Sequence, residues 1–445
     1  MKISIIGTGY VGLVSGVCLA EKGHDVTCVD NNQEKVEKIN CGMSPIYEEG
    51  LNELLIKNIG VRLKATSDLE SAIAQTDLTL IAVGTPFDGD EIDLQYVRQV
   101  AREIGTALKS KSGYHVVVVK STVVPGTTDD VVLPLLEEFS GRKAGEDFGV
   151  GMNPEFLREG SAIKDFMNPD RIVLGGIDDR SRAMLGQVYD MFPNVDVIRV
   201  NNKTAEMIKY TSNSLLATLI SFSNEIGNLC KSLGGIDAID VMNGVHLDQR
   251  VSPILENGQR ITPGITTYLE AGCGFGGSCF PKDVKALIAH GEKAGQSMRL
   301  LKSVIKVNLA QPYHVLQYLY KYFSDLKGIR VAVLGLAFKP GTDDMRESPA
   351  IPIIQKLIVT GAEVTVFDPI AMEEAKKIFG ENTISYHDSI EEAVKDAQAI
   401  LLLTRWDEFK LLPEVLNKLQ TSPVIVDGRR MLGSDSVASY EGIGL

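Results

Sequence analysis

The chain opens with Ile3-Ser4-Ile5-Ile6-Gly7-Thr8-Gly9-Tyr10-Val11-Gly12, and this stretch decides its fold. Its β-branched start predicts a short buried strand, and the G-x-G-x-x-G spacing predicts a tight turn into an apolar helix that runs to about Lys22. A second strand over 26–29 ends in Asp30. This order of strand, glycine turn, helix, strand and acid is the context of a dinucleotide-binding Rossmann unit.

The residues of this fingerprint have separate physical roles. We expect Gly7 to make the turn, Gly9 to let a pyrophosphate reach the helix N-terminus, and Gly12 to permit close packing of helix on strand. Asp30 can accept hydrogen bonds from adenosine ribose hydroxyls and would repel a 2′-phosphate. The sequence therefore predicts NAD, rather than NADP, as the cofactor.

A second informative stretch is Gly274-Phe275-Gly276-Gly277-Ser278-Cys279-Phe280-Pro281-Lys282-Asp283. Its glycines allow sharp turns and the close approach of another molecule, and Pro281 suits the first position of a helix. A thiol at a helix N-terminus lies near the positive end of the helix dipole, and Lys282 adds a positive charge nearby. Both would stabilise the reactive thiolate of Cys279. The alternative is a structural cysteine, because a free cysteine is most often simply buried.

Composition sets the class of protein. A chain of 445 residues needs two or three domains, and a formal net charge of −13 argues against non-specific binding of nucleic acid. The six cysteines form no C-x-x-C pair, which indicates reduced thiols and a cytosolic setting. The chain begins with a strand rather than a secretory signal, and it has no apolar run long enough for a bilayer, so we expect a cytoplasmic protein without a membrane partner.

Hydrophobic periodicity divides the chain into three parts, 1–202, 203–326 and 327–445. The first alternates strands and helices, which predicts a parallel sheet, with further strands over 78–83, 115–120, 148–153, 172–175 and 197–200. The second lacks strand signals and predicts helices over 203–233, 283–294 and 298–323, the last kinked or interrupted by Pro312. The third predicts strands over 331–334, 364–368, 400–403 and 424–427. The predicted fold is α/β, with two Rossmann-like doubly wound domains joined by a helical dimerisation region.

Several motifs resemble the UDP-glucose/GDP-mannose dehydrogenase family over nearly the whole chain, and most of all its UDP-glucose 6-dehydrogenases. These motifs are the opening fingerprint, 120–122, 153–160, 209–213, 274–283, 338–339 with 346–348, and 427–430. The resemblance implies oxidation of the primary alcohol of UDP-glucose to a carboxylate with two NAD⁺ and no metal. It also implies that Cys279 traps the aldehyde as a thiohemiacetal, which is oxidised to a thioester and then hydrolysed.

The resemblance also implies the rest of the catalytic set. Lys209 and Asn213 are four residues apart on a predicted helix, hence on one face, where they would stabilise an oxyanion. From spacing alone, the pair could equally be part of a solvated helix face. Glu155 is a candidate general base with Thr122 positioning water, and Asp283, one turn from the cysteine, would orient Lys209 or a water. The sequence leaves open which of Glu155 and Asp283 is the base.

The fingerprint, the polar residues after strand ends and the resemblance together define the expected binding residues. Those for the cofactor are Gly7, Gly9, Tyr10, Val11, Gly12, Asp30, Lys35, Thr85, Pro86, Ser121, Thr122, Glu159, Lys282 and Arg346. Those for the substrate are Glu155, Phe156, Leu157, Arg158, Glu159, Lys209, Asn213, Arg250, Tyr268, Leu269, Glu270, Ala271, Gly272, Gly276, Phe338, Lys339 and Arg429. Arg250 would reach the substrate across a homodimer interface, although the segment 251–273 is longer than the family usually shows. Metal binding by Cys273 and Cys279 is not expected, because no further ligands are clustered with them.

Three alternatives remain at this point. The same chemistry could act on GDP-mannose or a UDP-N-acetylhexosamine. A two-electron dehydrogenase of the hydroxyacid type would share the architecture but need no thiol. A protein that binds NAD without oxidising anything would need none of the catalytic residues.

Overall fold

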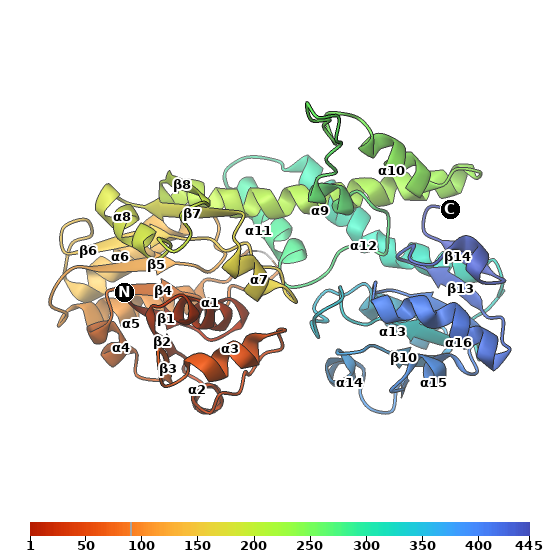
Figure 1. Cartoon of the computed structure of the whole chain (residues 1–445), viewed down its shortest axis with the longest axis horizontal. Coiled ribbons are helices and arrows are strands. Elements are labelled where there is room, and N and C mark those ends of the chain that lie inside the picture. The colour runs from red at the N-terminus through yellow and green to blue at the C-terminus, as the bar shows by residue number, and fades with distance from the viewer. Residues whose placement is uncertain (90) are drawn as a thin grey trace. The chain divides into compact units, whose positions relative to one another are not determined.

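The computed structural model describes residues 1–89 and 91–445, and the chain divides into two compact units, Met1–Ser212 and Asn213–Leu445. Each unit holds one sheet covered by helices (Figure 1). One long helix, α9 (Asn202–Leu233), begins in the first unit and continues into the second. The α/β fold class predicted from the sequence is confirmed.

The first unit contains an eight-stranded sheet in the order β3-β2-β1-β4-β5-β6-β7-β8. Its strands are β1 (Lys2–Ile6), β2 (Asp25–Val29), β3 (Leu63–Thr66), β4 (Leu78–Ile81), β5 (His115–Val119), β6 (Phe148–Met152), β7 (Arg171–Gly176) and β8 (Asp196–Val200). Neighbours pair in parallel except β6 and β7, which are antiparallel. The expectation of a wholly parallel sheet is therefore wrong at this pair, where the connection through α7 (Ala162–Met167) brings β7 back in the opposite direction beside β6.

The helices of the first unit cover both faces of its sheet. They are α1 (Tyr10–Glu21), α2 (Gln33–Asn40), α3 (Leu51–Asn58), α4 (Leu69–Gln75), α5 (Gln95–Leu108), α6 (Leu133–Ser140), α7 (Ala162–Met167) and α8 (Asp179–Gln187), with a π-helical turn η1 (Thr128–Val132). Ile5 and Leu80 pack in the cluster that includes α1, α3 and α7, whereas Ile6 and Ile81 pack in the cluster that includes α4, α5 and α6. This alternation follows the two-residue period of a strand.

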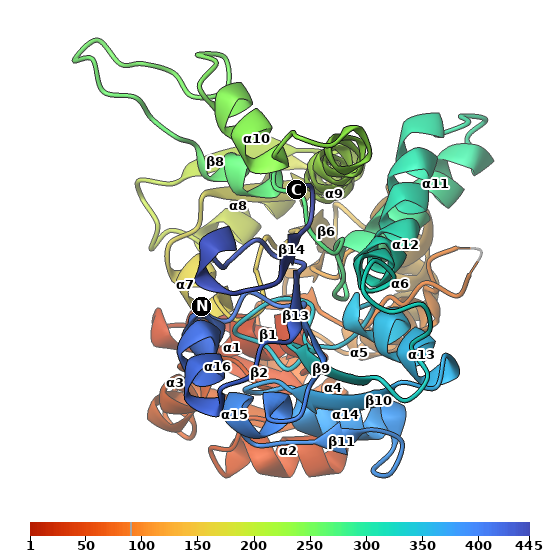
Figure 2. The same cartoon turned by 90° about the vertical axis from the view of Figure 1, so that its right-hand side faces the viewer.

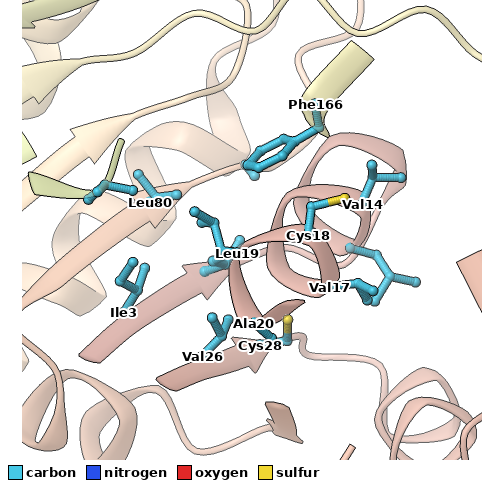
Figure 3. Packing of buried hydrophobic residues seen from close by; sticks show 14 of the residues in the cluster. Ile3, Val14, Val17, Cys18, Leu19, Ala20, Val26, Cys28, Leu80 and Phe166 are labelled. Atoms are coloured by element: carbon cyan, nitrogen blue, oxygen red, sulfur yellow. The ribbon is translucent and has the colours of Figure 1, made fainter. Parts of the chain in front are cut away.

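Figure 3 shows the core beside the fingerprint. Ile3 of β1, Val26 of β2 and Leu80 of β4 lie against α1, and Phe166 of α7 lies beside the same helix. The buried side chains that α1 contributes to this core include Val14, Val17, Cys18, Leu19 and Ala20. Burial raises the pKa of the Cys18 thiol to about 12, so this side chain stays a neutral thiol that contributes to core packing and not to catalysis.

The second unit begins with the rest of α9, followed by α10 (Ala238–His246), a short 3₁₀ turn η2 (Gly264–Tyr268), α11 (Phe280–Lys293) and α12 (Arg299–Leu319). The predicted helical middle is present. Pro312 lies inside α12 and does not interrupt it. The interruption is therefore not found, whereas the kink stays a prediction. Apolar residues on both sides of the proline are buried, including Val304, Val315 and Leu319, and their packing outweighs the loss of one backbone hydrogen bond.

A six-stranded parallel sheet completes the second unit, in the order β11-β10-β9-β12-β13-β14. Figure 2 labels all of these strands except β12. Its strands are β9 (Arg330–Leu334), β10 (Glu363–Phe367), β11 (Ser385–Tyr386), β12 (Ala399–Leu402), β13 (Val424–Asp427) and β14 (Tyr440–Gly442). Its helices are α13 (Ala350–Val359), α14 (Met372–Phe379), α15 (Ile390–Val394) and α16 (Leu412–Leu419), with 3₁₀ turns at Asp407–Leu411 and Ser434–Ser436. Across residues 1–89 and 91–445, every helix is too short or too polar to cross a bilayer.

Candidate functional site

The fingerprint glycines of the first unit are required by geometry. Gly7 has φ +97° and a Cβ there would lie 2.7 Å from the carbonyl oxygen of Ala82, while a Cβ on Gly12 would lie 1.9 Å from the carbonyl oxygen of Gly7. Gly9 precedes α1, and among the described residues no atom other than those of its chain neighbours lies within 4 Å of the position its Cβ would take. The N-terminus of α1 is therefore open to a phosphate group, which fits a dinucleotide.

Asp30 has the partners expected of a ribose-binding carboxylate. Its Oδ2 accepts hydrogen bonds from the backbone N–H of Thr8 at 2.9 Å and from the Thr8 hydroxyl at 2.6 Å, and its Oδ1 accepts from the Asn32 N–H at 3.0 Å. Burial alone would raise the pKa of Asp30, but these hydrogen bonds and the charge of Lys35 outweigh it and hold the pKa below its usual range. An ionised carboxylate has about four acceptor positions, so it can still bind ribose hydroxyls.

The polar residues after β4 and β5 lie together at the carboxyl edge of the first sheet. The Ser121 hydroxyl donates to the Val83 carbonyl at 2.7 Å, and the Thr85 hydroxyl donates to the Thr122 carbonyl at 2.8 Å. Pro86 follows directly and its carbonyl accepts from the Asp93 N–H at 2.8 Å. These contacts fix two of the loops expected at the cofactor.

A buried ion pair joins two residues of the expected catalytic set. The Lys209 ammonium of α9 lies 3.1 Å from Glu155 Oε1, and both side chains are about 95% buried, with 5% and 6% exposed. Glu155 Oε2 also accepts from the Leu157 N–H at 2.6 Å. The Arg171 guanidinium lies over the Phe156 ring, 3.8 Å from its centroid, and the Lys209 ammonium lies 5.4 Å from the same centroid. A carboxylate and an ammonium held in contact away from water can exchange a proton with a bound alcohol and stabilise an oxyanion.

Lys120 belongs to the same buried group, although sequence reasoning gave it no role. Its ammonium donates to Asn153 Oδ1 at 2.9 Å, and the hydroxyl of Tyr189 donates to the same oxygen. Burial lowers the pKa of Lys120 to about 8, Glu155 opposes that shift, and Lys209 adds to it. Its place directly after β5, in the run that leads to Ser121, was the signal that could have indicated it.

In the second unit, Cys279 is the residue from which α11 starts. Phe280, and not Pro281, is the first helical residue, and the Asp283 N–H donates to the Cys279 carbonyl at 2.8 Å. The half-buried thiol lies 3.6 Å from the hydroxyl of Ser278, a neighbour the sequence had not singled out. The predicted position of Cys279 at a helix N-terminus is confirmed, and the positive end of the dipole favours its thiolate there.

Asp283, one turn along α11 from Cys279, holds a polar cluster. Its Oδ2 accepts from the Asn213 side-chain amide at 2.6 Å, and its Oδ1 lies 2.6 Å from the Lys282 ammonium. Asp283 is 1% exposed. The structure thus brings Asn213 and Asp283 together, and it pairs the Lys282 charge with Asp283 one residue away.

The glycines before Cys279 make room for another part of the same unit. A Cβ on Gly276 would lie 2.4 Å from the Glu347 carbonyl oxygen, and a Cβ on Gly277 would lie 2.8 Å from the Phe338 ring. The Gly277 N–H donates to the Arg346 carbonyl at 2.8 Å. The sequence predicted that another molecule approaches these glycines closely. At Gly276 and Gly277 the neighbour is instead the segment 338–347 of the same chain.

Arg429 and the expected substrate loop 268–272 also meet in the second unit. The Arg429 guanidinium donates to the Leu403 carbonyl at 2.7 Å and lies 3.3 Å from where a Gly272 Cβ would be. Ala271 packs beside the core of this unit, and the Tyr268 ring lies 6.3 Å from the Phe280 ring. The sequence missed Arg405, whose guanidinium pairs with Glu270 at 2.7 Å.

Other expected binding residues are held by local ion pairs. Arg158 pairs with Asp165 at 2.6 Å, Arg346 pairs with Asp344 at 2.8 Å, and the exposed Arg250 pairs with Asp248. The longer segment forms a bridge between Ile254 and Arg260 and then η2, and the reach of Arg250 toward a second protomer stays a prediction. Among the remaining residues of that set, Val11 packs against the hydrophobic core and Leu269 directly follows η2. The Lys339 ammonium lies 5.6 Å from the centroid of the Phe338 ring, and the charge of Glu159 acts on Tyr10. In the part of the chain that the structure describes, no cluster of three His, Cys, Asp or Glu side chains could hold a metal.

The sequence matches three models of one family: the NAD binding domain over residues 1–193, the central domain over 203–310 and the UDP binding domain over 332–434 of the UDP-glucose/GDP-mannose dehydrogenase family. It is 43% identical to the UDP-glucose 6-dehydrogenase AglM of Haloferax volcanii, over 100% of both chains. It is 40% identical to a GDP-mannose 6-dehydrogenase of Pseudomonas savastanoi, over 96% of this chain and 95% of the other.

Among solved structures, a UDP-glucose dehydrogenase from Pyrobaculum islandicum matches with a TM-score of 0.90 and 40% identity, over 100% of this chain and 97% of the other. The open N-terminus of α1 and the carboxylate of Asp30 agree with the matched NAD binding domain. The chain therefore belongs to the UDP-glucose/GDP-mannose dehydrogenase family and is an NAD-dependent oxidoreductase.

Proposed function

We propose that this enzyme oxidises UDP-glucose to UDP-glucuronate, with Cys279 holding the half-oxidised sugar between two oxidations. The observation that carries the proposal is the position of Cys279 at the N-terminus of α11, where a thiolate is favoured. The full-length similarity to proteins named UDP-glucose 6-dehydrogenase supports the choice of sugar. A reactive thiol also needs a reducing compartment, which supports a cytoplasmic setting.

The proposed reaction balances in four steps. The C6 hydroxyl gives its proton to Glu155 and its carbon-bound hydrogen leaves as hydride, which produces an aldehyde. The Cys279 thiolate then adds to the aldehyde carbon, and the resulting thiohemiacetal oxyanion loses a second hydride, which gives a thioester. Water attacks the thioester, the carbon–sulfur bond breaks, and the carboxylate leaves while the thiol is restored. NAD⁺ supplies the acceptor for both hydrides, two molecules being used for each sugar.

The contacts of the two carboxylates support different roles for them. Asp283 is held by the Asn213 amide and the Lys282 ammonium, so we assign it to positioning Asn213. Glu155 contacts a cation that could receive or release a proton, which favours it as the base, with Lys209 stabilising the oxyanion. Thr122 would position the hydrolytic water. Phe156, Phe338, Lys339 and Arg429 would contact the sugar nucleotide.

The assembly and domain limits are part of the proposal. We assign residues 1–202 to NAD, 203–326 to the catalytic cysteine and dimerisation, and 327–445 to the nucleotide of the substrate. A homodimer is supported by apolar side chains that α9 leaves exposed, including Phe222, Leu229 and Leu233 at 50%, 53% and 66%. Sedimentation equilibrium tests this, since a monomer at micromolar concentration would contradict it.

The test of the activity is the amount of NADH formed from a limiting amount of each nucleotide sugar. Two NADH per UDP-glucose, and little turnover of GDP-mannose or a UDP-N-acetylhexosamine, are expected. GDP-mannose is the second candidate, because a GDP-mannose 6-dehydrogenase is nearly as similar to this chain. Preference for GDP-mannose would overturn the assigned sugar, and one NADH per sugar would overturn the four-electron reaction in favour of a two-electron dehydrogenase.

A further inference from the structure

Glu48 is a buried carboxylate that the proposed reaction does not use. It lies in the loop before α3 and is 6% exposed. Its Oε1 accepts from the Ala162 N–H at 2.7 Å, and its Oε2 accepts from the Gly160 N–H at 2.7 Å and from the hydroxyl of Tyr10. Three donors converge on one carboxylate away from water, which makes each of these hydrogen bonds charge-assisted.

The donors come from two functional segments that are far apart in sequence. Tyr10 is the first residue of α1, directly after the open glycine of the dinucleotide turn. Gly160 ends the loop 155–160, which contains Glu155 and Glu159, and Ala162 begins α7. The Gly160 N–H also reaches the Tyr10 hydroxyl at 3.1 Å. Glu48 therefore connects the start of α1 to the loop that bears the proposed base.

The protonation state of Tyr10 suits this connection. Burial first, and then the hydrogen bond to Glu48 and the charges of Glu48 and Glu159, raise the pKa of Tyr10 above its usual range. The hydroxyl therefore stays protonated near neutral pH and donates to the carboxylate. The hydrogen bonds described for the Glu48 carboxylate all come from neutral donors, which are the Tyr10 hydroxyl and the N–H groups of Gly160 and Ala162.

We propose that Glu48 is a positioning residue that fixes the loop 155–160 against the start of α1, so that dinucleotide and sugar nucleotide bind interdependently. The assignment of the sugar side rests on the proposed function. A dinucleotide at the glycine turn would stabilise the start of α1, and Tyr10 connects that segment to Glu48 by a hydrogen bond. Gly160 and Ala162 connect Glu48 to the loop 155–160 and to the start of α7 in the same way. Coupling of this kind is reciprocal, because each ligand stabilises the same arrangement of the two segments.

The test is a fluorescence titration of the protein with NADH, alone and with saturating UDP-glucose. The variants are Glu48→Gln, which puts an amide donor where backbone donors point, and Tyr10→Phe, which removes one donor and leaves Gly160 and Ala162 bound. In the wild type we expect UDP-glucose to tighten NADH binding about fivefold or more. In Glu48→Gln the NADH dissociation constant rises about tenfold and the tightening disappears. In Tyr10→Phe we expect UDP-glucose to tighten NADH binding by an intermediate factor. This variant tests the proposal even if Glu48→Gln does not fold.

A matched control is Glu206→Gln. Glu206 is fully buried in the same unit and also accepts two backbone N–H groups, from Gly126 at 2.6 Å and Thr128 at 2.8 Å, at the start of η1. We expect Glu206→Gln to lose about as much thermal stability as Glu48→Gln, while UDP-glucose still tightens NADH binding as in the wild type. Coupling that survives in both Glu48→Gln and Tyr10→Phe, or that is lost equally in Glu206→Gln, would overturn the proposal. The titration needs no turnover, so a failed activity assay would instead count against the proposed function.

Discussion

Replacing Gly277 by alanine should destabilise the second unit by two separable amounts. Gly277 has φ +82°, and an alanine in the left-handed region costs about 1–2 kcal/mol. The new Cβ would also lie 2.8–3.0 Å from three atoms of the Phe338 ring, and overpacking of this kind costs about 1–3 kcal/mol. We therefore expect a loss of about 2–5 kcal/mol in the free energy of unfolding, measured by urea denaturation.

Gly258→Ala separates the two contributions. Gly258 has φ +80° in the same unit, but in residues 1–89 and 91–445 no atom beyond its chain neighbours lies within 4 Å of its Cβ position. Only the backbone cost of about 1–2 kcal/mol therefore applies. In a Phe338→Ala background the clash is absent, so Gly277→Ala should lower the free energy of unfolding, relative to Phe338→Ala alone, by the backbone cost only. Equal losses for Gly277→Ala and Gly258→Ala would refute the inferred packing of the cysteine loop on residues 338–347.

Three further predictions concern charged groups of the first unit. Burial lowers the pKa of Lys120 from 10.5 to about 8, so the folded chain loses this proton at a lower pH than the unfolded chain does. The buried charge destabilises the folded chain by a constant amount below about pH 8, and this cost falls as the pH rises and the charge is lost. The free energy of unfolding of the wild type relative to Lys120→Met should thus rise by about 2 kcal/mol from pH 7.5 to 9.5, and a flat difference in urea titrations would contradict this. Lys209→Met leaves the Glu155 carboxylate buried without its cation, which should lower the free energy of unfolding by about 3–5 kcal/mol. Changing both Lys209 and Glu155 to methionine should recover most of this loss. A double variant as unstable as the single one would argue against the ion pair. Asp30→Asn should lower the preference for NAD over NADP in kcat/KM by about tenfold, because the charge that repels the 2′-phosphate is gone; an unchanged ratio would locate cofactor selection elsewhere.

The parts of the site that depend on local geometry could be predicted from the sequence. The spacing of Gly7, Gly9 and Gly12 between two β-branched strands defines a turn whose φ angle and close packing follow from the missing Cβ atoms. The start of the helix after Cys279 follows from Pro281 and from helix-forming residues beyond it, to within one residue. Both features need only neighbours in the chain.

The parts that depend on distant segments could not be predicted. Glu48 and Gly160 are 112 residues apart, and nothing in the loop before α3 indicates which N–H groups its carboxylate will meet. Lys120 was noticed only as part of a motif, because its effect depends on Asn153 and Tyr189 arriving from other elements. The antiparallel pairing of β6 and β7, with Gly151 opposite Gly176, likewise depends on how the chain returns to the sheet.

Pro312 illustrates a local rule overruled by packing. Proline favours a helix break, yet the side chains of α12 on both sides of it are buried in two hydrophobic clusters, among them Val304 and Leu316. Burial of such side chains contributes about 1.5–3 kcal/mol each, which is comparable to the cost of one proline in a helix. Sequence alone does not reveal which residues are buried.

The covalent role of Cys279 can be observed directly by mass spectrometry of enzyme quenched in acid during turnover of UDP-glucose with excess NAD⁺. We predict that the peptide containing Cys279 gains the mass of the sugar-nucleotide acyl group, and that Cys279→Ser shows no such gain and does not complete the second oxidation. Full conversion to the carboxylate without any adduct on the wild-type thiol, or undiminished formation of two NADH per sugar by the serine variant, would contradict the account.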